Sequence, residues 1–478
     1  MKFEILAEKN DGDRKTFFYD NETNTLSSED GFVYEYPEIE PVEMKDATRF
    51  DKNNPLKKSK VITLLKIQLG LSCNYSCDYC SQKFIERAPE TSKKDIDAFM
   101  EMLDNLEFDE TRGLRIEFWG GEPLVYWKTL RPLAEALKER FDQWSKEPVF
   151  SIITNGSLLN KEMTMWLYYM GFQVAISHDG PGQSVRGPDP FDDPTKKKII
   201  LDFWKLMHKH NRISFNAMMN SKNTSRKSVR DYFVDITGDP TVKIGEGGIV
   251  DAYDEDGITN SLQTLEEHFS YRRQSFDDIF SNDGQINNIG ILGKIDTFTQ
   301  NVLSHQHSRY LPQKCGMDDE HTMAIDLRGN VITCQNTSAV ETGMNGESHL
   351  SGHITDMEAV EIKTATHWSN RKECGSCPVL HICKGACMFL DKKFWDISCA
   401  NAYSDNVPLF ALSIEKITGY IPITVKGEGL PLEREDIWGT IYQHTEKQKK
   451  VIPIRVVSEK VAVIDDVEIY GKSRVEIN

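Results

Sequence analysis

The chain has 478 residues and a formal net charge of −17, with 39% hydrophobic and 10% aromatic residues. This composition suffices for buried cores, and the acidic balance argues against nucleic-acid binding, because phosphate contacts need clustered Lys and Arg. No apolar run approaches the ~20 residues needed to span a membrane, and the first residues lack a secretory signal. We therefore expect a cytoplasmic, membrane-independent protein with more than one domain.

Residues 1–60 alternate short apolar runs with polar turns, which predicts a small β-rich element and a linker. From residue 61 onward, strand and helix patterns alternate regularly, and Ser92 is the expected N-cap of the first helix. The expected strands are 61–69, 113–121, 149–156, 172–180, 212–220 and 241–250, and the expected helices between them are 92–106, 129–144, 160–171, 194–211 and 225–237.

Six such repeats imply an α/β fold with a parallel sheet and right-handed crossovers. The repeats occupy roughly 200 residues, fewer than the ~250 of a complete eightfold barrel, so an open, partial (β/α)6 barrel of TIM type is expected. Two amphipathic helices follow, at 261–280 and 290–305, and the tail from about 420 is again β-like. The expected domains are 1–60, 61–305 for the partial barrel with its bridging helices, 306–405 for a cysteine-rich unit, and 406–478 for a C-terminal helix and β-like extension.

Unusual motifs follow the first four strands of the expected sheet. In parallel α/β folds the carboxyl ends of the strands carry the chemistry, so these motifs are expected to meet there. They are "CNYSCDYC" (73–80), "GGEP" (120–123), "TNGS" (154–157) and "SHDGPGQSVR" (177–186). Any one of them alone is weak, because glycine after a strand usually makes an ordinary turn.

Cys73, Cys77 and Cys80 form a Cx3Cx2C loop with Tyr79 before the third cysteine. This loop, opening a partial barrel, resembles the radical S-adenosylmethionine (SAM) superfamily. The resemblance implies a [4Fe–4S] cluster held by three thiolates, whose fourth iron is left for SAM. The family cleaves SAM with one electron from an external reductant, such as a flavodoxin or ferredoxin, and the resulting 5′-deoxyadenosyl radical abstracts hydrogen. The alternative is a zinc site with a distant fourth ligand.

The same resemblance assigns SAM contacts to the other three motifs. Gly120, Gly121 and Glu122 match the segment that holds the methionyl amino group, and Tyr79 is expected near adenine. Asn155 and Ser157 match contacts to ribose and carboxylate. Ser177 and Arg186 match carboxylate contacts of the branch that matures sulfatases. Without the family, the Ser and Asn residues would be ordinary turn residues.

The remaining cysteines, like the first three, suit metal ligation better than disulfides in a reducing compartment. Their spacing resembles the SPASM domain, an auxiliary-cluster module of radical SAM enzymes that mainly modify peptides and proteins. By this resemblance Cys374, Cys377, Cys383 and Cys399 hold one auxiliary [4Fe–4S] cluster. Cys315, Cys334 and Cys387 hold another, which gives three clusters in all. Zinc is the alternative occupant, because thiolates bind both metals.

Two departures from the sulfatase-maturase pattern concern the group of three cysteines. Two full clusters need eight thiolates and seven are present, so one iron is open or has another ligand; His305 and His307 lie nearby in sequence. The Asp expected directly after Cys334 is Gln335, which does not act as a base at neutral pH. We therefore favour a maturase of ribosomally made peptides that cross-links, oxidises or epimerises its substrate.

Two other functions remain open. One is a formylglycine-forming sulfatase maturase or a radical SAM enzyme for a small molecule, against which Gln335 and the missing cysteine weigh. The other is a non-enzymatic iron–sulfur or zinc scaffold, against which the "GGEP" and "TNGS" motifs weigh. Under the favoured reading the partners are a precursor peptide or protein and an electron-donor protein.

Overall fold

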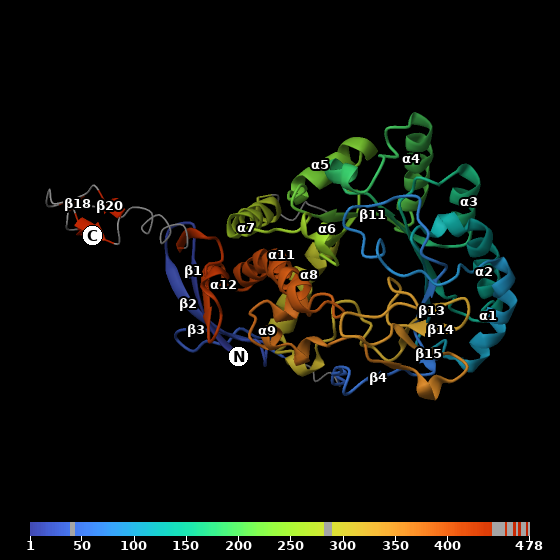
Figure 1. The fold of residues 1–478 in the computed structure, drawn as a ribbon, viewed down its shortest axis with the longest axis horizontal. Helices are drawn as coiled ribbons and strands as arrows, with labels where there is room; N and C mark the ends of the chain where they lie inside the picture. Colours follow the sequence, from blue (N-terminus) through green and yellow to red (C-terminus); the bar gives the residue numbers. More distant parts are fainter. Residues whose placement is uncertain are drawn as a thin grey trace.

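The computed structural model describes residues 1–38, 44–281 and 289–441, together with four short strands between 455 and 476. Helices surround the outer face of a large sheet at one end of the molecule, and a small sheet lies at the other end (Figure 1). The cysteine-rich segment lies between the two sheets.

The large sheet has nine strands in the order β12-β11-β10-β9-β8-β6-β13-β14-β15. Its six parallel strands from the expected repeats are β6 (Leu64–Gln68), β8 (Arg115–Trp119), β9 (Val149–Thr154), β10 (Gln173–Ser177), β11 (Ile213–Met219) and β12 (Ile244–Ile249). Each coincides with a predicted strand, so the prediction of a parallel α/β sheet in sequential order is confirmed. The pairing leaves β12 and β15 at the two edges, and the sheet is therefore open.

The crossover helices also lie where the apolar periodicity predicts them. They are α1 (Ile96–Met102), α2 (Trp127–Arg140), α3 (Lys161–Tyr169), α4 (Pro194–His208) and α5 (Arg226–Thr237). The Ser92 side chain caps a 3-10 turn directly before α1, which confirms the expected cap, and Asn160 and Ser225 cap α3 and α5 in the same way. These helices bury their apolar faces against the sheet in one continuous core.

The cysteine-rich segment does not form a separate sheet but extends the large one. β13 (Thr322–Asp326) pairs in parallel with β6, and β14 (Asn330–Ile332) and β15 (Leu350–His353) continue the sheet in antiparallel fashion. All five residues of β13 are buried. The expected domains 61–305 and 306–405 therefore share one sheet.

The N-terminal element is a three-stranded sheet completed by the C-terminal part of the chain. β1 (Lys2–Glu8), β2 (Arg14–Asp20) and β3 (Thr25–Ser28) form a meander, and β17 (Ile421–Gly427) pairs with the free side of β1. This sheet packs on α7 (Leu265–Phe280), α8 (Ile289–Leu303) and α11 (Lys392–Thr418). The elements expected at the two ends of the chain thus form one unit, with β17 beside β1 in Figure 1.

Helix α11 crosses the expected boundary between the cysteine-rich unit and the C-terminal extension. That boundary, between residues 405 and 406, lies inside one continuous 27-residue helix that also contains Cys399. From Tyr403 to Ile414 every residue of the helix is buried, including Asp405 and Pro408. This stretch therefore has no amphipathic period, whereas the start of the helix keeps the exposed residues Lys392, Lys393 and Asp396.

Short elements complete the described chain. They are α6 (Glu255–Ile258), α9 (Lys372–Gly375), α10 (Leu380–Cys383), α12 (Leu432–Glu435), the pairs β4 (Leu56–Lys57) with β16 (Glu361–Ile362) and β5 (Val61–Ile62) with β7 (Glu107–Phe108), and the tail strands β18 (Arg455–Val456), β19 (Ala462–Ile464), β20 (Val467–Ile469) and β21 (Val475–Glu476). The rest of the predicted β-like tail lies outside the described residues. Among the helices that are described, none has the length and apolarity needed to cross a membrane.

Candidate functional site

The loop of Cys73, Cys77 and Cys80 leaves the carboxyl end of β6 and packs on the "GGEP" loop after β8. A Cβ on Gly121 would lie 2.6 Å from the carbonyl oxygens of Leu71 and Ser72. A Cβ on Gly120 would lie 2.9 Å from the carbonyl oxygen of Gly70. The two glycines therefore allow the backbone after β8 to touch the backbone that leads into Cys73.

Glu122 is almost fully buried and lies next to the cysteine loop. Its carboxylate accepts hydrogen bonds from the Thr154 hydroxyl at 2.6 Å and from the backbone N–H groups of Asn155 at 2.7 Å and Leu124 at 3.0 Å. Burial raises the pKa of Glu122, and these hydrogen bonds lower it in part. Three donors from two loops thus hold one carboxylate beside the three thiols.

The "TNGS" motif is bonded to the cysteine loop through Asn74, which sequence reasoning did not single out. The Asn155 amide donates to Asn74 Oδ1 at 3.0 Å, and Asn74 Nδ2 donates to the Ser157 hydroxyl at 2.8 Å. Ser157 Oγ in turn donates to Asn155 Oδ1 at 2.6 Å. The side chains expected to contact SAM therefore form one polar cluster around the cysteine loop.

Tyr79 and Arg186 contact each other, and both contact Asp179. Asp179 lies just beyond β10 and is fully buried. Arg186 Nη1 donates to the Tyr79 hydroxyl at 2.8 Å and lies 3.4 Å from Asp179 Oδ1, and the Tyr79 hydroxyl donates to Asp179 Oδ2. Burial raises the pKa of Cys77 to about 12, while Arg186 opposes this shift. Arg186 Nε is buried without a hydrogen-bond partner, so it is available to an anion such as a carboxylate. Ser177 is buried at the end of β10.

The seven downstream cysteines form two groups. Cys374, Cys377, Cys383 and Cys399 line one small cavity, and burial and then the other three thiols raise the pKa of Cys374. Cys315, Cys334 and Cys387 line a second cavity of about 380 Å³. The structure thus brings together the same sets of three and four thiols that the resemblance to the SPASM domain implies.

Backbone N–H groups donate to sulfurs in two of the cysteine groups. Tyr75 N–H donates to Cys73 Sγ at 3.3 Å and Asn336 N–H donates to Cys334 Sγ at 3.4 Å. In the group of four, Arg434 Nη2 donates to Cys399 Sγ at 3.3 Å. Hydrogen bonds to sulfur stabilise metal-bound thiolates and tune iron–sulfur potentials. The donor sets therefore fit iron–sulfur clusters.

Within the described ranges, no three His, Cys, Asp or Glu side chains lie closely enough to hold a single metal ion. A cubane separates its thiolates more widely than one ion does, because each thiolate binds a different iron. His305 and His307 do not line the cavity of Cys315, Cys334 and Cys387. They lie beside carboxylates of the N-terminal segment, at 3.8 Å from Glu35 and 4.0 Å from Glu22.

The 380 Å³ cavity connects the two halves of the site. Its wall includes Ser81, Phe84 and Ile85, directly after the three-cysteine loop, and the thiols of Cys315, Cys334 and Cys387. Gln68, at the end of β6, donates to the carbonyl groups of Gln335 and Thr337, both at 2.7 Å, and fixes this wall to the large sheet.

Three charged or polar residues of this cavity were missed by sequence reasoning because no motif surrounds them. Asp251 follows β12, accepts a hydrogen bond from the Ser398 hydroxyl and lies beside Lys314. Burial raises the pKa of Asp251 above its ordinary value, and Lys314 and Ser398 oppose this shift. The Tyr253 hydroxyl is hydrogen bonded to Cys387. The cavity therefore contains the carboxyl group of Asp251, although Gln335 stands where the sulfatase-maturase pattern has an Asp.

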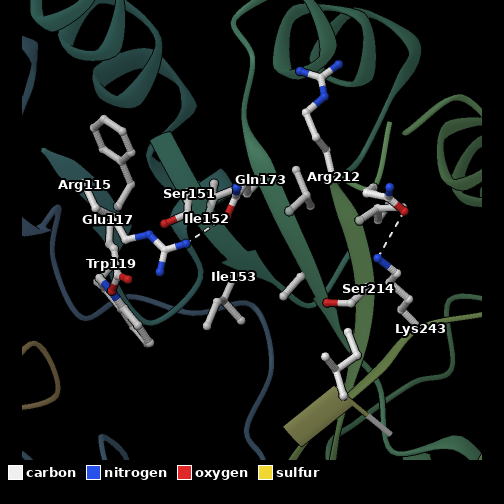
Figure 2. Close-up of a pocket in the computed structure, with 16 residues that line it drawn as sticks. Arg115, Glu117, Trp119, Ser151, Ile152, Ile153, Gln173, Arg212, Ser214 and Lys243 are labelled. Atoms are coloured by element: carbon white, nitrogen blue, oxygen red, sulfur yellow. Dashed lines mark hydrogen bonds between the residues drawn. The ribbon is translucent and has the colours of Figure 1, made fainter. Parts of the chain in front are cut away.

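A further cavity of about 300 Å³ opens at the other, amino-terminal ends of the strands (Figure 2). Arg115, Arg212 and Lys243 lie at its mouth. Arg115 donates to Gln173 at 2.9 Å, Arg212 to the carbonyl group of Tyr168 at 3.1 Å and Lys243 to Asn211 at 3.0 Å. Because the amino-terminal side of such sheets serves stability rather than chemistry, we do not place the active site there.

Comparisons with known proteins agree with this arrangement. Residues 67–231 match the model of the radical SAM superfamily. Radical SAM cyclopropyl synthase TigE from Paramaledivibacter caminithermalis is 22% identical over 368 residues, which cover 72% of this chain and 72% of TigE.

The solved structures of anSMEcpe have a similar fold. The structure with bound AdoMet and the Cp18Cys peptide covers 74% of this chain and 99% of its own, with 19% identity and a TM-score of 0.51. The structure with AdoMet alone covers 74% of this chain and 100% of its own, with 18% identity and a TM-score of 0.52. The superfamily implies a [4Fe–4S] cluster and SAM, and the three thiols and the loops around them fit both. Residues 67–231 therefore match a radical SAM domain, which confirms the resemblance read from the cysteine loop.

Proposed function

We propose that the enzyme cleaves SAM reductively and abstracts hydrogen from a residue of a ribosomally made peptide or protein, leading to a cross-link, oxidation or epimerisation. The cavity of about 380 Å³ carries this proposal. It is lined both by the segment after the SAM-site cysteines and by the thiols of Cys315, Cys334 and Cys387. A side chain of a peptide that entered it would lie between the two.

The residues of this chain have distinct roles in the proposal. Cys73, Cys77 and Cys80 hold the cluster that reduces SAM, and Arg186, with its unpaired Nε, binds the SAM carboxylate. The loops of Glu122 and of Asn155 and Ser157 fix the cysteine loop and contact SAM. When bound, the cluster and SAM supply the radical chemistry, and the protein orients the substrate and excludes water.

The two downstream thiol groups hold auxiliary [4Fe–4S] clusters in this proposal. The donors to Cys334 and Cys399 support it, because hydrogen bonds to sulfur stabilise thiolates. The Cp18Cys peptide bound to anSMEcpe, a protein of similar fold, supports a substrate that is a peptide. The electrons come from a flavodoxin or ferredoxin.

A second candidate is the oxidation of Ser or Cys in a sulfatase-type protein. Gln335 weighs against this function, because the amide side chain of Gln does not act as a base at neutral pH. The Asp251 carboxylate, which lies in the same cavity as Gln335, favours it, since Asp251 is placed to accept the proton that such an oxidation releases.

Anaerobic reconstitution tests the proposal. We expect about twelve iron atoms per chain, four for each of three cubanes, and 5′-deoxyadenosine on addition of SAM and dithionite. Mass spectrometry of short peptides encoded beside the gene should then show a modified residue. Loaded protein that forms no 5′-deoxyadenosine would contradict the proposal.

Two cysteine substitutions separate the cluster roles. Cys73→Ala should abolish SAM cleavage. Cys377→Ala, in the distant group of four thiols, should retain some cleavage that is uncoupled from peptide modification. Equal loss in both variants would argue against separate roles for the cysteine groups.

A further inference from the structure

Arg434 lies in α12, beyond the cysteine-rich segment, yet it touches one of the cysteine groups. Its Nη2 donates to Cys399 Sγ at 3.3 Å, and its guanidinium lies 5.1 Å from the centroid of the Tyr403 ring. An arginine of α12 thus donates directly to a sulfur of this cysteine group.

A second arginine beside Arg434 makes the local charge more positive. Arg272, from α7, is buried and lies 5.0 Å from the centroid of the same Tyr403 ring. Burial lowers the pKa of Arg272 to about 10, and the charge of the half-buried Arg434 contributes to the shift. The carboxyl groups of Asp436 and Glu433 oppose this shift, whereas the sulfur that Arg434 contacts belongs to the cavity of Cys374, Cys377, Cys383 and Cys399.

The backbone around Arg434 is held in place by side chains of two long helices. Arg272 Nη1 donates to the carbonyl groups of Glu433 at 2.9 Å and Asp436 at 3.3 Å, and the Tyr403 hydroxyl donates to the carbonyl group of Arg434. The position of the guanidinium is therefore fixed by the fold, unlike that of an arginine on the surface.

We propose that Arg434 is a positioning residue that raises the reduction potential of the cluster held by Cys374, Cys377, Cys383 and Cys399. The proposal rests on the auxiliary cluster of the proposed function. A reduced cluster carries one more negative charge than an oxidised one, so a fixed cation stabilises the reduced state more. A hydrogen bond to a ligand sulfur acts in the same direction.

The test is a redox titration followed by electron paramagnetic resonance. The full chain is loaded with iron and sulfide in a background in which Cys73, Cys77 and Cys80 are alanine, so that only auxiliary clusters give signals. In Arg434→Gln we expect one signal to shift to more negative potential. Arg434→Lys, which keeps the charge, should shift less.

Two controls accompany the titration. The signal of the cluster at Cys315, Cys334 and Cys387 should not move in the same sample. Arg309→Gln, at an exposed arginine, should leave both potentials unchanged.

The outcomes separate this inference from the function on which it rests. An unchanged potential in fully loaded Arg434→Gln overturns the inference alone. Equal loss of iron and signal in Arg434→Gln and Arg434→Lys also overturns it, because Arg434 would then serve the fold. A parent protein with no cluster signal overturns both the inference and the proposed auxiliary clusters.

Discussion

Gly121 shows how a single side chain determines whether the cysteine loop can form. Its missing Cβ leaves room for carbonyl oxygens that would lie 2.6 Å away, a separation at which backbone atoms must move. We expect Gly121→Ala to lose most of the iron of the SAM site and its 5′-deoxyadenosine production, because the displaced backbone leads directly into Cys73. Iron analysis and product assay measure this.

Gly293, in helix α8, is the matched control. A Cβ there meets no atom within 4 Å, and Ala is favoured over Gly in helices by up to about 1 kcal/mol. Gly293→Ala should therefore keep full iron and activity. A Gly121→Ala protein with normal iron content would show that the loops can separate without cost.

Asp251 is the residue in the cavity whose chemistry is most open to test. If it accepts the substrate proton, Asp251→Asn should keep 5′-deoxyadenosine formation and slow the modified product by about 10²–10⁴-fold, the range of general-base catalysis. The two products are measured in the same reaction by mass spectrometry. Equal rates of product formation in both proteins would assign Asp251 to structure alone.

At the scale of elements, helix α11 joins α5 and α7 through one buried side chain. Asp405 lies on it, fully surrounded by protein, 2.6 Å from Arg226 of α5 and 2.9 Å from the hydroxyl of Tyr271 of α7. Asp405→Ala should destabilise the fold by roughly 3–5 kcal/mol, because the ion pair between two buried side chains, Asp405 and Arg226, is broken. Denaturant unfolding of the metal-free chain measures this.

An exposed ion pair gives the contrast. Lys198 and Asp202 are 2.6 Å apart on the surface of α4, and such pairs contribute at most about 0.5 kcal/mol. Asp202→Ala should therefore change stability little. If the two alanine variants lost similar stability, the buried pair would have no special weight in joining the helices.

Much of the element pattern was accessible from sequence because it is local. The six strands and the crossover helices follow apolar periods and caps such as Ser92, and each was found where predicted. The pairing of β13 with β6 and of β1 with β17 joins distant segments and leaves no local signal. The stretch of α11 from Tyr403 to Ile414 is buried all round and shows no amphipathic period. The two cysteine groups were assigned from the resemblance to the SPASM domain, whereas Asp251 and Arg434 stand in no motif.

At the scale of the whole molecule, three buried histidines make stability depend on pH. His268, His349 and His381 lie in different elements, and burial is the main cause that lowers the pKa of each to about 4. Below the ordinary pKa of 6.5 the unfolded chain binds protons that the folded chain does not, so stability falls as pH drops from 6.5 towards 4.

The effect is large enough to measure. At pH 5.5 each histidine should cost about 1.4 kcal/mol relative to neutral pH, the equivalent of one pKa unit. His268→Gln should remove about one third of this loss in denaturant unfolding at pH 5.5 and 7.5. A variant with the same pH dependence as the parent would show that His268 is protonated in the folded protein.

The sheet of β17, β1, β2 and β3 also has a consequence for synthesis on the ribosome. Phe3 pairs with Gly427, so β1 leaves the ribosome long before its partner strand β17 is made. At ~5–20 residues per second, β1 waits roughly 20–80 s for β17. During that time the edge of β1 is open to other nascent chains, and all ten cysteines emerge before the sheet closes. Expression at low temperature or with slow codons lengthens this interval, and co-expressed chaperones that cover strand edges should raise the yield of the intact protein.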